Sequence, residues 1–384
     1  MNDLLSLIIP TKNRSFYCMY AIKQILALKL PEIEICIQDN SDTDDLRREI
    51  ESLKSDQVVY NYHAGILSFV DNFSEAVSIS HGEYVCMIGD DDGILPNIVE
   101  YVEKAKKNNY DAIIPGLDYV YFWPSQEPIE EDINKGRLDI LHSRRRERIV
   151  DTNKAIKRLL SNASQEYTCL DIPRLYHGIV KRSVLDRVKD KTGYFFGGLT
   201  PDMYMAAVLS LECGTVLKTT ESFTISGICP KSGSADSATG RHTGKLSDAP
   251  HFKGHSSYVW NVNIPPFYSV DTIWSETLLN ALESYNRRDL VDLFNLPLLE
   301  ALCLKKYPEY SSIIMEHAKD HDITKLKMTF SYIYYIVPKI AKKVWRKAIR
   351  VFMGILDSKH TYKKRILNIS TIIDAERTIL ELMN

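Results

Sequence analysis

Residues 84–93 read YVCMIGDDDG, a short apolar run that ends in a glycine and three consecutive carboxylates. The run has the length of a buried parallel strand. Because side chains alternate along an extended segment, Asp90 and Asp92 are expected to project to one side and Asp91 to the other. Two carboxylates one residue apart suit Mn²⁺ or Mg²⁺, which keep several waters and take phosphate oxygens as further ligands. The alternative is a solvated acidic turn before a helix that starts near Pro96.

Two more polar loops follow predicted strands upstream. The apolar run Leu4–Ile9 leads into Pro10–Arg14, and Ile33–Ile37 leads into Gln38–Asp42. Between these segments the pattern predicts helices over residues 15–28, 44–54 and 68–80 and a strand over residues 58–62. This alternation predicts an α/β fold, with a Rossmann-like, mostly parallel sheet flanked by helices. Ligands of such sheets bind beyond the carboxyl ends of the strands, so the three loops are expected to form one site.

The order of these motifs resembles a known family. Pro-Thr-x-Asn-Arg follows the first strand, Asp-Asn-Ser follows the second, and Gly-Glu-Tyr-x-x-x-x-Gly-Asp-Asp-Asp contains the fourth. Together they resemble the inverting family 2 nucleotide-sugar glycosyltransferases, which have the GT-A fold. The resemblance is strong over residues 4–115 and weaker over residues 165–225. It implies a nucleoside diphosphate sugar as donor, most often a UDP sugar, and a glycan or lipid-linked acceptor.

The resemblance also implies roles for the first two loops. Asp39 would accept a hydrogen bond from the base, typically uracil. The first loop would contact the base and ribose through Pro10, Thr11, Asn13 and Arg14. From the residues alone, Asp39 and Asp42 are equally explained as turn formers, since Asp stabilises loops by bonding its own backbone. Asn72 occupies a position where family members often carry Asn, although a polar residue on a helix face explains it as well.

For the third loop, the resemblance implies contacts of Asp90 and Asp91 with the ribose or diphosphate. Asp92 would bind the Mn²⁺ or Mg²⁺ ion that bridges the diphosphate. Family members often place a basic residue or a histidine in a later loop. In this sequence the candidates are Arg241 for the diphosphate and His242 for the metal shell.

A later helix start supplies a candidate catalytic base. Thr200 is expected to cap a helix that begins at Pro201 and ends near Glu212. Family 2 enzymes present an acidic residue here as the general base that deprotonates the acceptor hydroxyl, which makes Asp202 the candidate. An acid in the first turn also complements the helix dipole whatever its function. The sequence departs from the family's usual Glu-Asp pair, because Pro201 precedes the acid.

The predicted domain organisation has three parts. Residues 1–225 form the GT-A domain, with a nucleotide-sugar half (1–115) and an acceptor half (116–225). Residues 226–260, rich in Gly, Ser, Lys and His, are expected to form a flexible lid loop. Residues 261–384 are expected to be helical. In the acceptor half, the aromatic stretch Tyr119–Pro124 suits either local core or stacking on a sugar.

The C-terminal region contains a basic amphipathic segment, Ile336–Leu356. Between Lys325 and Arg365 there are 12 Lys or Arg residues and one acid, Asp357. Such a helix suits an acidic membrane surface. The alternative is a helix that packs on a neighbour or on a second copy in a homo-oligomer, with a solvated basic face.

Composition restricts the remaining possibilities. The formal net charge of -2 gives no global basic field for nucleic acid. Seven scattered cysteines suit buried thiols in a reducing compartment. We expect neither a signal peptide nor a membrane-spanning helix, and hence a cytoplasmic protein, peripheral on the inner face of the membrane if the basic helix binds lipid.

The predicted activity is non-processive transfer of a hexose or N-acetylhexosamine, because the Gln-x-x-Arg-Trp motif of processive synthases is absent. Assembly of bacterial surface polysaccharide (O-antigen, capsule or teichoic acid) is the expected setting. A sugar-phosphate nucleotidyltransferase would carry a glycine-rich first loop, whereas Pro10–Arg14 has no glycine. A haloacid-dehalogenase-type phosphatase would carry its acids at the first strand. A non-catalytic nucleotide-sugar-binding or scaffolding protein of a polysaccharide assembly complex remains the alternative.

Overall fold

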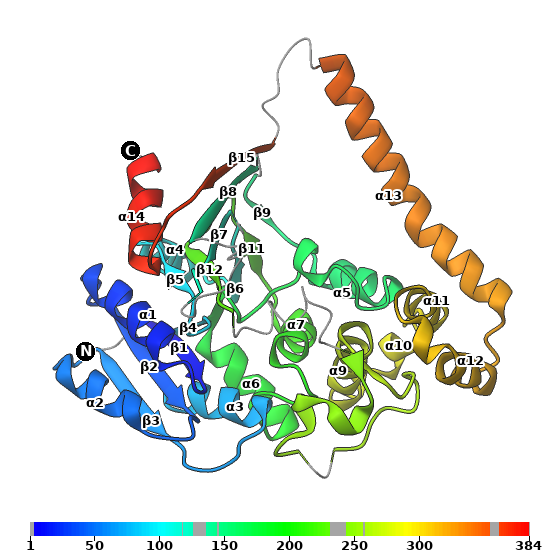
Figure 1. Ribbon diagram of the computed structural model, residues 1–384, viewed down its shortest axis with the longest axis horizontal. Helices are drawn as coiled ribbons and strands as arrows, with labels where there is room; N and C mark the ends of the chain where they lie inside the picture. Colours follow the sequence, from blue (N-terminus) through cyan, green and yellow to red (C-terminus); the bar gives the residue numbers. More distant parts are fainter. Residues whose placement is uncertain are drawn as a thin grey trace.

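An eight-stranded sheet forms the centre of the protein in the computed structural model, which describes residues 4–116, 118–125, 136–143, 146–230, 243–255, 258–353 and 361–383 (Figure 1). The strand order is β3-β2-β1-β4-β10-β6-β11-β9. In chain order the strands are β1 (Leu5–Thr11), β2 (Ile33–Asp39), β3 (Val58–Tyr62), β4 (Tyr84–Met87), β6 (Ala112–Ile114), β9 (Arg148–Ile149), β10 (Ile179–Lys181) and β11 (Val216–Lys218). Strand β10 is antiparallel to both its neighbours and β9 is antiparallel to β11, while the other pairs are parallel. The predicted mostly parallel α/β sheet is confirmed.

Helices cover both faces of this sheet. They are α1 (Ser15–Ala27), α2 (Asp45–Ser52), α3 (Phe69–Ser78), α4 (Ile98–Asn108), α5 (Thr152–Ser161), α6 (Arg182–Thr192) and α7 (Pro201–Glu212). Side-chain alternation in β1 assigns Leu7 and Ile9 to the core shared with α1, α2 and α4. Ile8 belongs to the opposite core, shared with α3, α5, α6 and α7. Because both faces are covered, β1 and β2 are buried at every position, as in other parallel sheets.

A second, five-stranded sheet lies beside the first, in the order β15-β8-β7-β12-β5. Its strands are β5 (Gly93–Ile94), β7 (Tyr119–Phe122), β8 (Arg137–Ser143), β12 (Thr224–Ile228) and β15 (Thr361–Ile366). Tyr121 and Trp123 are fully buried, so these two aromatics of the 119–124 stretch belong to the local core. Strand β12 also contains Ser226–Ile228, which the sequence had assigned to the lid loop.

The described part of the predicted lid has local structure of its own. It contains β13 (Thr243–Gly244) and the short 3₁₀ helices η2 (Leu246–Asp248) and η3 (Pro250–Phe252). Strand β13 pairs with β14 (Tyr268–Ser269), which leads directly into α9 (Val270–Ser284). Ser269 and Thr272 form a reciprocal capping box at the start of α9. Helix α9 in turn packs against α7.

The remaining helices extend from this point to residue 353. They are α10 (Arg288–Val291), α11 (Leu296–Lys306), α12 (Ser311–Asp320) and α13 (Lys325–Met353), with the short η4 (Pro308–Tyr310) between α11 and α12. Helix α13 stands at the edge of the molecule, away from the central sheet (Figure 1). None of the helices in the described ranges is both long and apolar enough to cross a bilayer.

After α13 the chain returns to the first domain. Strand β15 pairs with β8, and α14 (Ile372–Met383) packs against α1 and β5. Ile372 and Ile379 are fully buried in one cluster with Tyr17 and Trp123. The prediction that residues 261–384 are helical is therefore wrong for Thr361–Ile366, which form a strand, while Ile372–Met383 are helical as expected. These residues complete a sheet and a core that begin more than 200 residues earlier.

The return of α14 predicts a large contribution to stability. Ile372→Ala should lower the free energy of unfolding by about 2–5 kcal/mol, because it removes a fully buried side chain and leaves a cavity. Leu382→Ala, on the exposed side of the same helix, should change it by less than about 0.5 kcal/mol. Denaturant unfolding of both variants measures the difference. Equal, small effects would show that α14 is not part of the core.

Candidate active site

The three carboxylates lie in the turn between β4 and β5, where the carboxyl ends of β1 and β4 meet. Asp90, Asp91 and Asp92 are 0, 3 and 0 % exposed. The alternative of a solvated acidic turn is therefore wrong. Removing adjacent carboxylates from water costs several kcal/mol for each ionised group unless donors or cations surround them. The described residues supply such donors from four separate segments of the chain.

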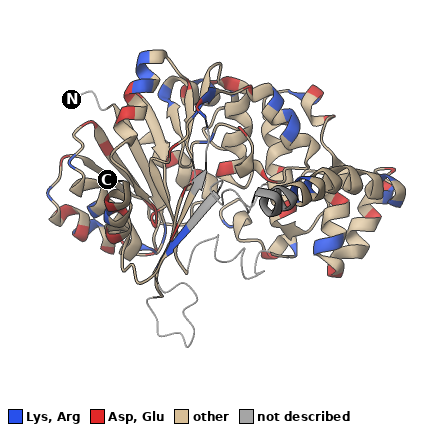
Figure 2. Cartoon of the chain, turned by 90° about the horizontal axis from the view of Figure 1, so that it is seen from above, with Lys and Arg blue, Asp and Glu red and all other residues tan. Residues whose placement is uncertain are grey.

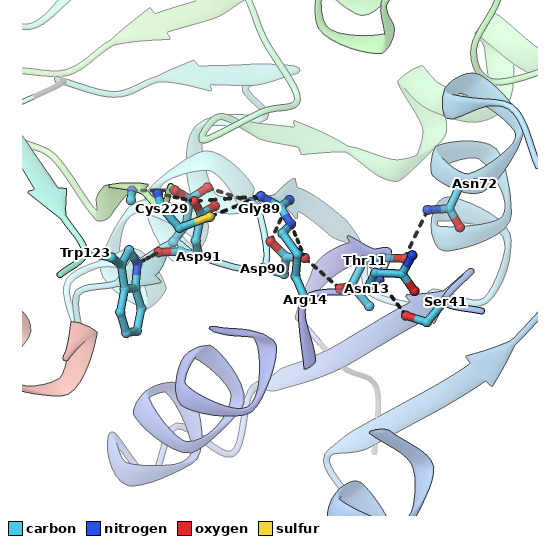
Figure 3. A network of polar contacts seen from close by, with 12 residues as sticks. Thr11, Asn13, Arg14, Ser41, Asn72, Gly89, Asp90, Asp91, Trp123 and Cys229 are labelled. Carbon is cyan, nitrogen blue, oxygen red and sulfur yellow. Dashed lines mark hydrogen bonds and ion pairs between the residues drawn. The ribbon is translucent and has the colours of Figure 1, made fainter. Parts of the chain in front are cut away.

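Asp90 forms an ion pair with the first loop (Figure 3). Arg14 Nη2 lies 2.7 Å from Asp90 Oδ1, and Arg14 Nε donates to Asp90 Oδ2 at 3.0 Å. Thr11 Oγ1 donates to the same Oδ2 at 2.6 Å. Burial raises the pKa of Asp90, and the charge of Arg14 opposes that rise. Two-point contact with a guanidinium keeps this pair ionised at neutral pH.

Asp91 faces the same cation but is less fully bonded. Its Oδ2 accepts from the backbone N–H of Cys229 at 2.9 Å and lies 3.9 Å from Arg14 Nη1. Its backbone carbonyl accepts from the indole N–H of Trp123 at 2.8 Å. Among the described residues, no hydrogen bond reaches Asp91 Oδ1. Asp91 thus keeps one carboxylate oxygen for a ligand.

Asp92 is bonded at both oxygens by the protein. Its Oδ2 accepts from Gly89 N at 2.6 Å and from the Tyr176 hydroxyl at 2.8 Å, and its Oδ1 accepts from Gly227 N at 2.6 Å. His177 Nε2 lies 3.5 Å from Oδ2. A side chain at Gly227 would place its Cβ 1.8 Å from the carbonyl oxygen of Asp91, so β12 can approach this closely only with glycine there. Asp92 therefore ties the end of β4 to the second sheet.

The predicted alternation of the triplet is wrong. Asp90 and Asp91 both approach Arg14, and Asp92 turns toward Gly227 and Tyr176. Strand β4 ends at Met87, so the carboxylates occupy a turn in which the two-residue period of a strand no longer holds.

Asp92 and Asp91 are consequently predicted to differ in their effect on stability. In Asp92→Asn one oxygen becomes an NH₂ group that faces a backbone N–H, which should cost about 1–3 kcal/mol. In Asp91→Asn the remaining oxygen can still accept from Cys229 N, so stability should change little. Thermal unfolding of the two variants compares them directly. Equal melting temperatures would contradict the bonding described for Asp92.

The first two loops interlock, as their order predicted. Asn13 Nδ2 donates to Asp42 Oδ2 at 3.0 Å, and Asp42 N donates to Asn13 Oδ1 at 2.9 Å. Asp39 is fully buried, and its oxygens accept from Ser41 N at 2.8 Å and from the Tyr60 hydroxyl at 2.9 Å. Asp39 thus stabilises its own turn, as the turn-former interpretation expects. Each of its oxygens has a second lone pair with which a ligand could bond.

Asn72 belongs to this site and is not the exposed polar residue on a helix face that its pattern predicted. It is buried on α3 and directs Nδ2 toward the carbonyl oxygen of Thr11, 3.5 Å away (Figure 3). Its Oδ1 is buried and has no hydrogen-bond partner in the part of the chain that the structure describes. Pro10 and Thr11 close β1 opposite Gln38 and Asp39 of β2. Folds of this class bind their ligands at the ends of parallel strands. The acceptor Asn72 Oδ1 is therefore placed where a ligand is expected.

Asp202 lies in the first turn of α7, which begins at Pro201 as expected. Thr200 occupies the cap position, but its side chain makes no capping hydrogen bond. The Tyr167 hydroxyl donates a hydrogen bond to Asp202 Oδ2 at 3.0 Å. Burial raises the pKa of Asp202, while the hydrogen bond from Tyr167 works against that rise. Thr277 Oγ1 on α9 accepts from Thr200 N at 3.3 Å and so fixes the start of the helix.

Residues 174–177 connect the triplet with Asp202. Tyr176 pairs with Met87 beside β4, and its hydroxyl reaches Asp92. Burial and, to a smaller extent, the charge of the buried Arg174 together lower the pKa of His177 to about 3, so this imidazole is neutral. The charge of Arg174 also lowers the pKa of Asp202. Arg174 therefore lies close enough to act on Asp202 and on His177, whose Nε2 lies 3.5 Å from Asp92 Oδ2.

No local sequence pattern marks this connecting segment. In the structure only residues 179–181 form β10, and His177 has a left-handed backbone with φ of 61°. Two other candidates cannot be placed, because Arg241 and His242 lie outside the described residues. Within the part that is described, no group of three or more His, Cys, Asp or Glu could hold a metal ion.

Fold and site together define a class of protein. The sheet has parallel strands β3, β2, β1 and β4, and a buried acidic turn with strand-end polar loops forms its carboxyl edge. That is the architecture of a GT-A glycosyltransferase domain. Residues 6–170 match the model of the family described as "Glycosyl transferase family 2". This match confirms, for residues 6–170, the resemblance inferred from the motifs.

The chain is also similar to solved structures. No curated protein matches the chain. A crystal structure of S. aureus TarS 1-349 with UDP-GlcNAc is 12% identical, with a TM-score of 0.45, and the alignment covers 84% of this chain and 93% of that one. A crystal structure of S. aureus TarS 1-349 with UDP is 15% identical, with a TM-score of 0.44, and the alignment covers 83% of this chain and 92% of that one. A crystal structure of S. aureus TarS is 13% identical, with a TM-score of 0.46, and the alignment covers 81% of this chain and 55% of that one. The family assignment itself comes from residues 6–170.

Proposed function

We propose that the chain transfers one sugar from a nucleoside diphosphate donor, UDP in the first place, to an acceptor hydroxyl with inversion of the anomeric centre. The observation that carries this proposal is the pairing of two acidic sites through residues 174–177. One is the triplet at the strand ends, beside Arg14, and the other is Asp202 on α7. Transfer needs neutralisation of a leaving diphosphate and a base for the incoming hydroxyl.

The polar groups at the ends of β1 and β2 support a base that carries an N–H donor. Asn72 Oδ1 is a buried acceptor with no partner among the described residues, and each oxygen of Asp39, at the end of β2, has a second lone pair. Uracil offers such a donor at its ring nitrogen, whereas the ring N3 of cytosine carries no hydrogen. Arg14 supplies positive charge close to where the phosphates would lie. Thr11 and Asn13 hold the loop that carries it.

The acidic turn fits a divalent cation of the Mn²⁺ or Mg²⁺ type, with Asp91 rather than Asp92 as its ligand. Within the described ranges no hydrogen bond is made to Asp91 Oδ1, while both oxygens of Asp92 are bonded by the protein. One carboxylate suffices, because these ions take diphosphate oxygens and waters as further ligands. When bound, such an ion would act as a Lewis acid that offsets the charge on the leaving diphosphate. Arg241 remains the candidate for the diphosphate and His242 for the metal shell.

Asp202 is proposed as the general base. Its raised pKa brings it nearer to neutral pH, where a base is most effective. It would take the proton of the acceptor hydroxyl as that oxygen attacks the anomeric carbon. The carbon–oxygen bond to the diphosphate breaks on the opposite face, so the configuration inverts without a covalent enzyme intermediate. Tyr167 orients the carboxylate and keeps its pKa from rising further.

Variants of Asp202 and Tyr167 test this assignment. Asp202→Asn should lower kcat by about 10²- to 10⁴-fold, with donor affinity unchanged. Tyr167→Phe removes a hydrogen bond that lowers the pKa of Asp202, so the acidic limb of the pH–rate profile should move to higher pH. Transfer assays across pH 5–9 measure both effects. Wild-type turnover in Asp202→Asn would refute the base assignment.

The donor and the metal are tested by titration calorimetry with UDP, GDP, dTDP and CDP, each with and without Mn²⁺. We expect UDP to bind most tightly and Mn²⁺ to tighten it. Asp91→Asn should lose the gain from Mn²⁺ but keep the melting temperature of the wild type. A Mn²⁺ effect that survives in Asp91→Asn would contradict this ligand assignment.

We place the reaction in the assembly of bacterial surface polysaccharide, with single addition to a glycan or lipid-linked acceptor. The missing Gln-x-x-Arg-Trp motif supports single addition. A non-catalytic nucleotide-sugar-binding or scaffolding role is the alternative. It predicts nucleotide binding without release of sugar from any UDP sugar, with or without acceptor, so a hydrolysis and transfer assay separates the two.

A further inference from the structure

Helix α13 has one face that packs on the protein. Met328 is buried, and Tyr332 and Tyr335 contact the core formed by α9 and α11. Tyr332 accepts from Lys305 Nζ at 2.6 Å. Lys339 Nζ forms an ion pair with Glu166 at 2.7 Å. These contacts fix the rotation of the helix about its own axis.

The opposite face of α13 is apolar and exposed. Its side chains are 46–83 % exposed: Leu326, Phe330, Ile333, Tyr334, Val337, Ile340, Val344 and Trp345. Six of them recur at intervals of four and three residues, which keeps them on one side of a helix. Isolated exposed apolar residues are ordinary, but a continuous row of this length marks a binding surface.

The charged residues of α13 are all cationic. Eight of its 29 residues are Lys or Arg and none is Asp or Glu (Figure 2). Six of the eight fall between Lys339 and Arg350. The whole chain carries a net charge of -2, so this concentration is local. At helical spacing, Lys339, Lys342 and Lys343 lie away from the row of apolar side chains.

We propose that the exposed face of α13 docks the protein on an acidic lipid bilayer. A helix with aromatic and aliphatic residues on one side and Lys and Arg on the other lies in the plane of a membrane interface, with its apolar side among the lipids. Aromatic residues such as Tyr334 and Trp345 suit the headgroup level. Anionic lipids attract the cations, which lie within reach of the headgroups through their long side chains.

Charge decides between this occupant and a second copy of the chain. Pairing two α13 helices would place two sets of eight cations on adjacent helices that contain no acid, and of these cations Lys339 forms an ion pair, with Glu166, within the described ranges. An acidic bilayer gains about 1 kcal/mol for each cation near its surface, or about 5-fold in affinity. The docking is independent of the proposed sugar transfer, because no residue of α13 belongs to the candidate active site.

Vesicle co-sedimentation of the full chain tests the proposal. The vesicles are phosphatidylcholine alone or phosphatidylcholine with one quarter phosphatidylglycerol. We expect binding to the acidic vesicles only, and weaker binding in 1 M NaCl. Lys342→Gln/Lys343→Gln should weaken it about 25-fold, at about 5-fold for each cation. Equal binding to neutral and acidic vesicles would overturn the proposal.

Apolar substitutions provide the second arm. Ile340→Asn/Val344→Asn should abolish sedimentation with acidic vesicles, because it removes two membrane-facing side chains. Val259→Asn/Val262→Asn is the matched control, since both valines are exposed and lie outside α13. Melting temperatures should stay at the wild-type value in both variants. Analytical ultracentrifugation detects the other occupant: a dimer that Ile340→Asn/Val344→Asn dissociates, together with no vesicle binding, would overturn the proposal.

Discussion

Burial of three adjacent carboxylates is the constraint on which the structure around the site depends. Each ionised carboxylate removed from water costs several kcal/mol. The donors that offset this cost come from different segments: Thr11 at the end of β1 and Arg14 after it, Tyr176 before β10, and the backbone around Gly227. The acidic turn therefore holds the two sheets together at the edge where the ligand is expected. The acids that the proposed chemistry uses therefore also stabilise the fold. In the proposal Asp92 has this structural role alone, because the protein bonds both of its oxygens.

The sequence predicted the first half of the fold well, because its signals are local. Apolar runs such as Leu4–Ile9 and helical spacing such as that of residues 69–77 are properties of neighbouring residues. The return of β15 and α14 could not be predicted in this way. The contact between Asp139 and Arg365 spans 226 positions, and the pattern of residues 361–383 alone says nothing about what they pack against.

The site was predictable to a similar extent. Parallel strands bring their carboxyl ends together, so the meeting of the loops that contain Thr11, Asp39 and Asp90 followed from strand order. The role of each acid did not follow. Which oxygen of the triplet is left free depends on Gly227 and Tyr176, whose approach no local pattern encodes. Asp202 was found from its helix start, whereas its partners Tyr167 and Arg174 carried no signal.

The central claim is that the ends of β1 and β4 form the nucleotide site of a glycosyltransferase. A crystal structure of the chain with UDP and Mn²⁺ tests it most directly. The account predicts the diphosphate beside Arg14, the ion on Asp91 and not on Asp92, and the uracil near Asp39 and Asn72. Nucleotide bound elsewhere, or an ion coordinated by Asp92 with its contacts to Gly227 and Tyr176 broken, would contradict it.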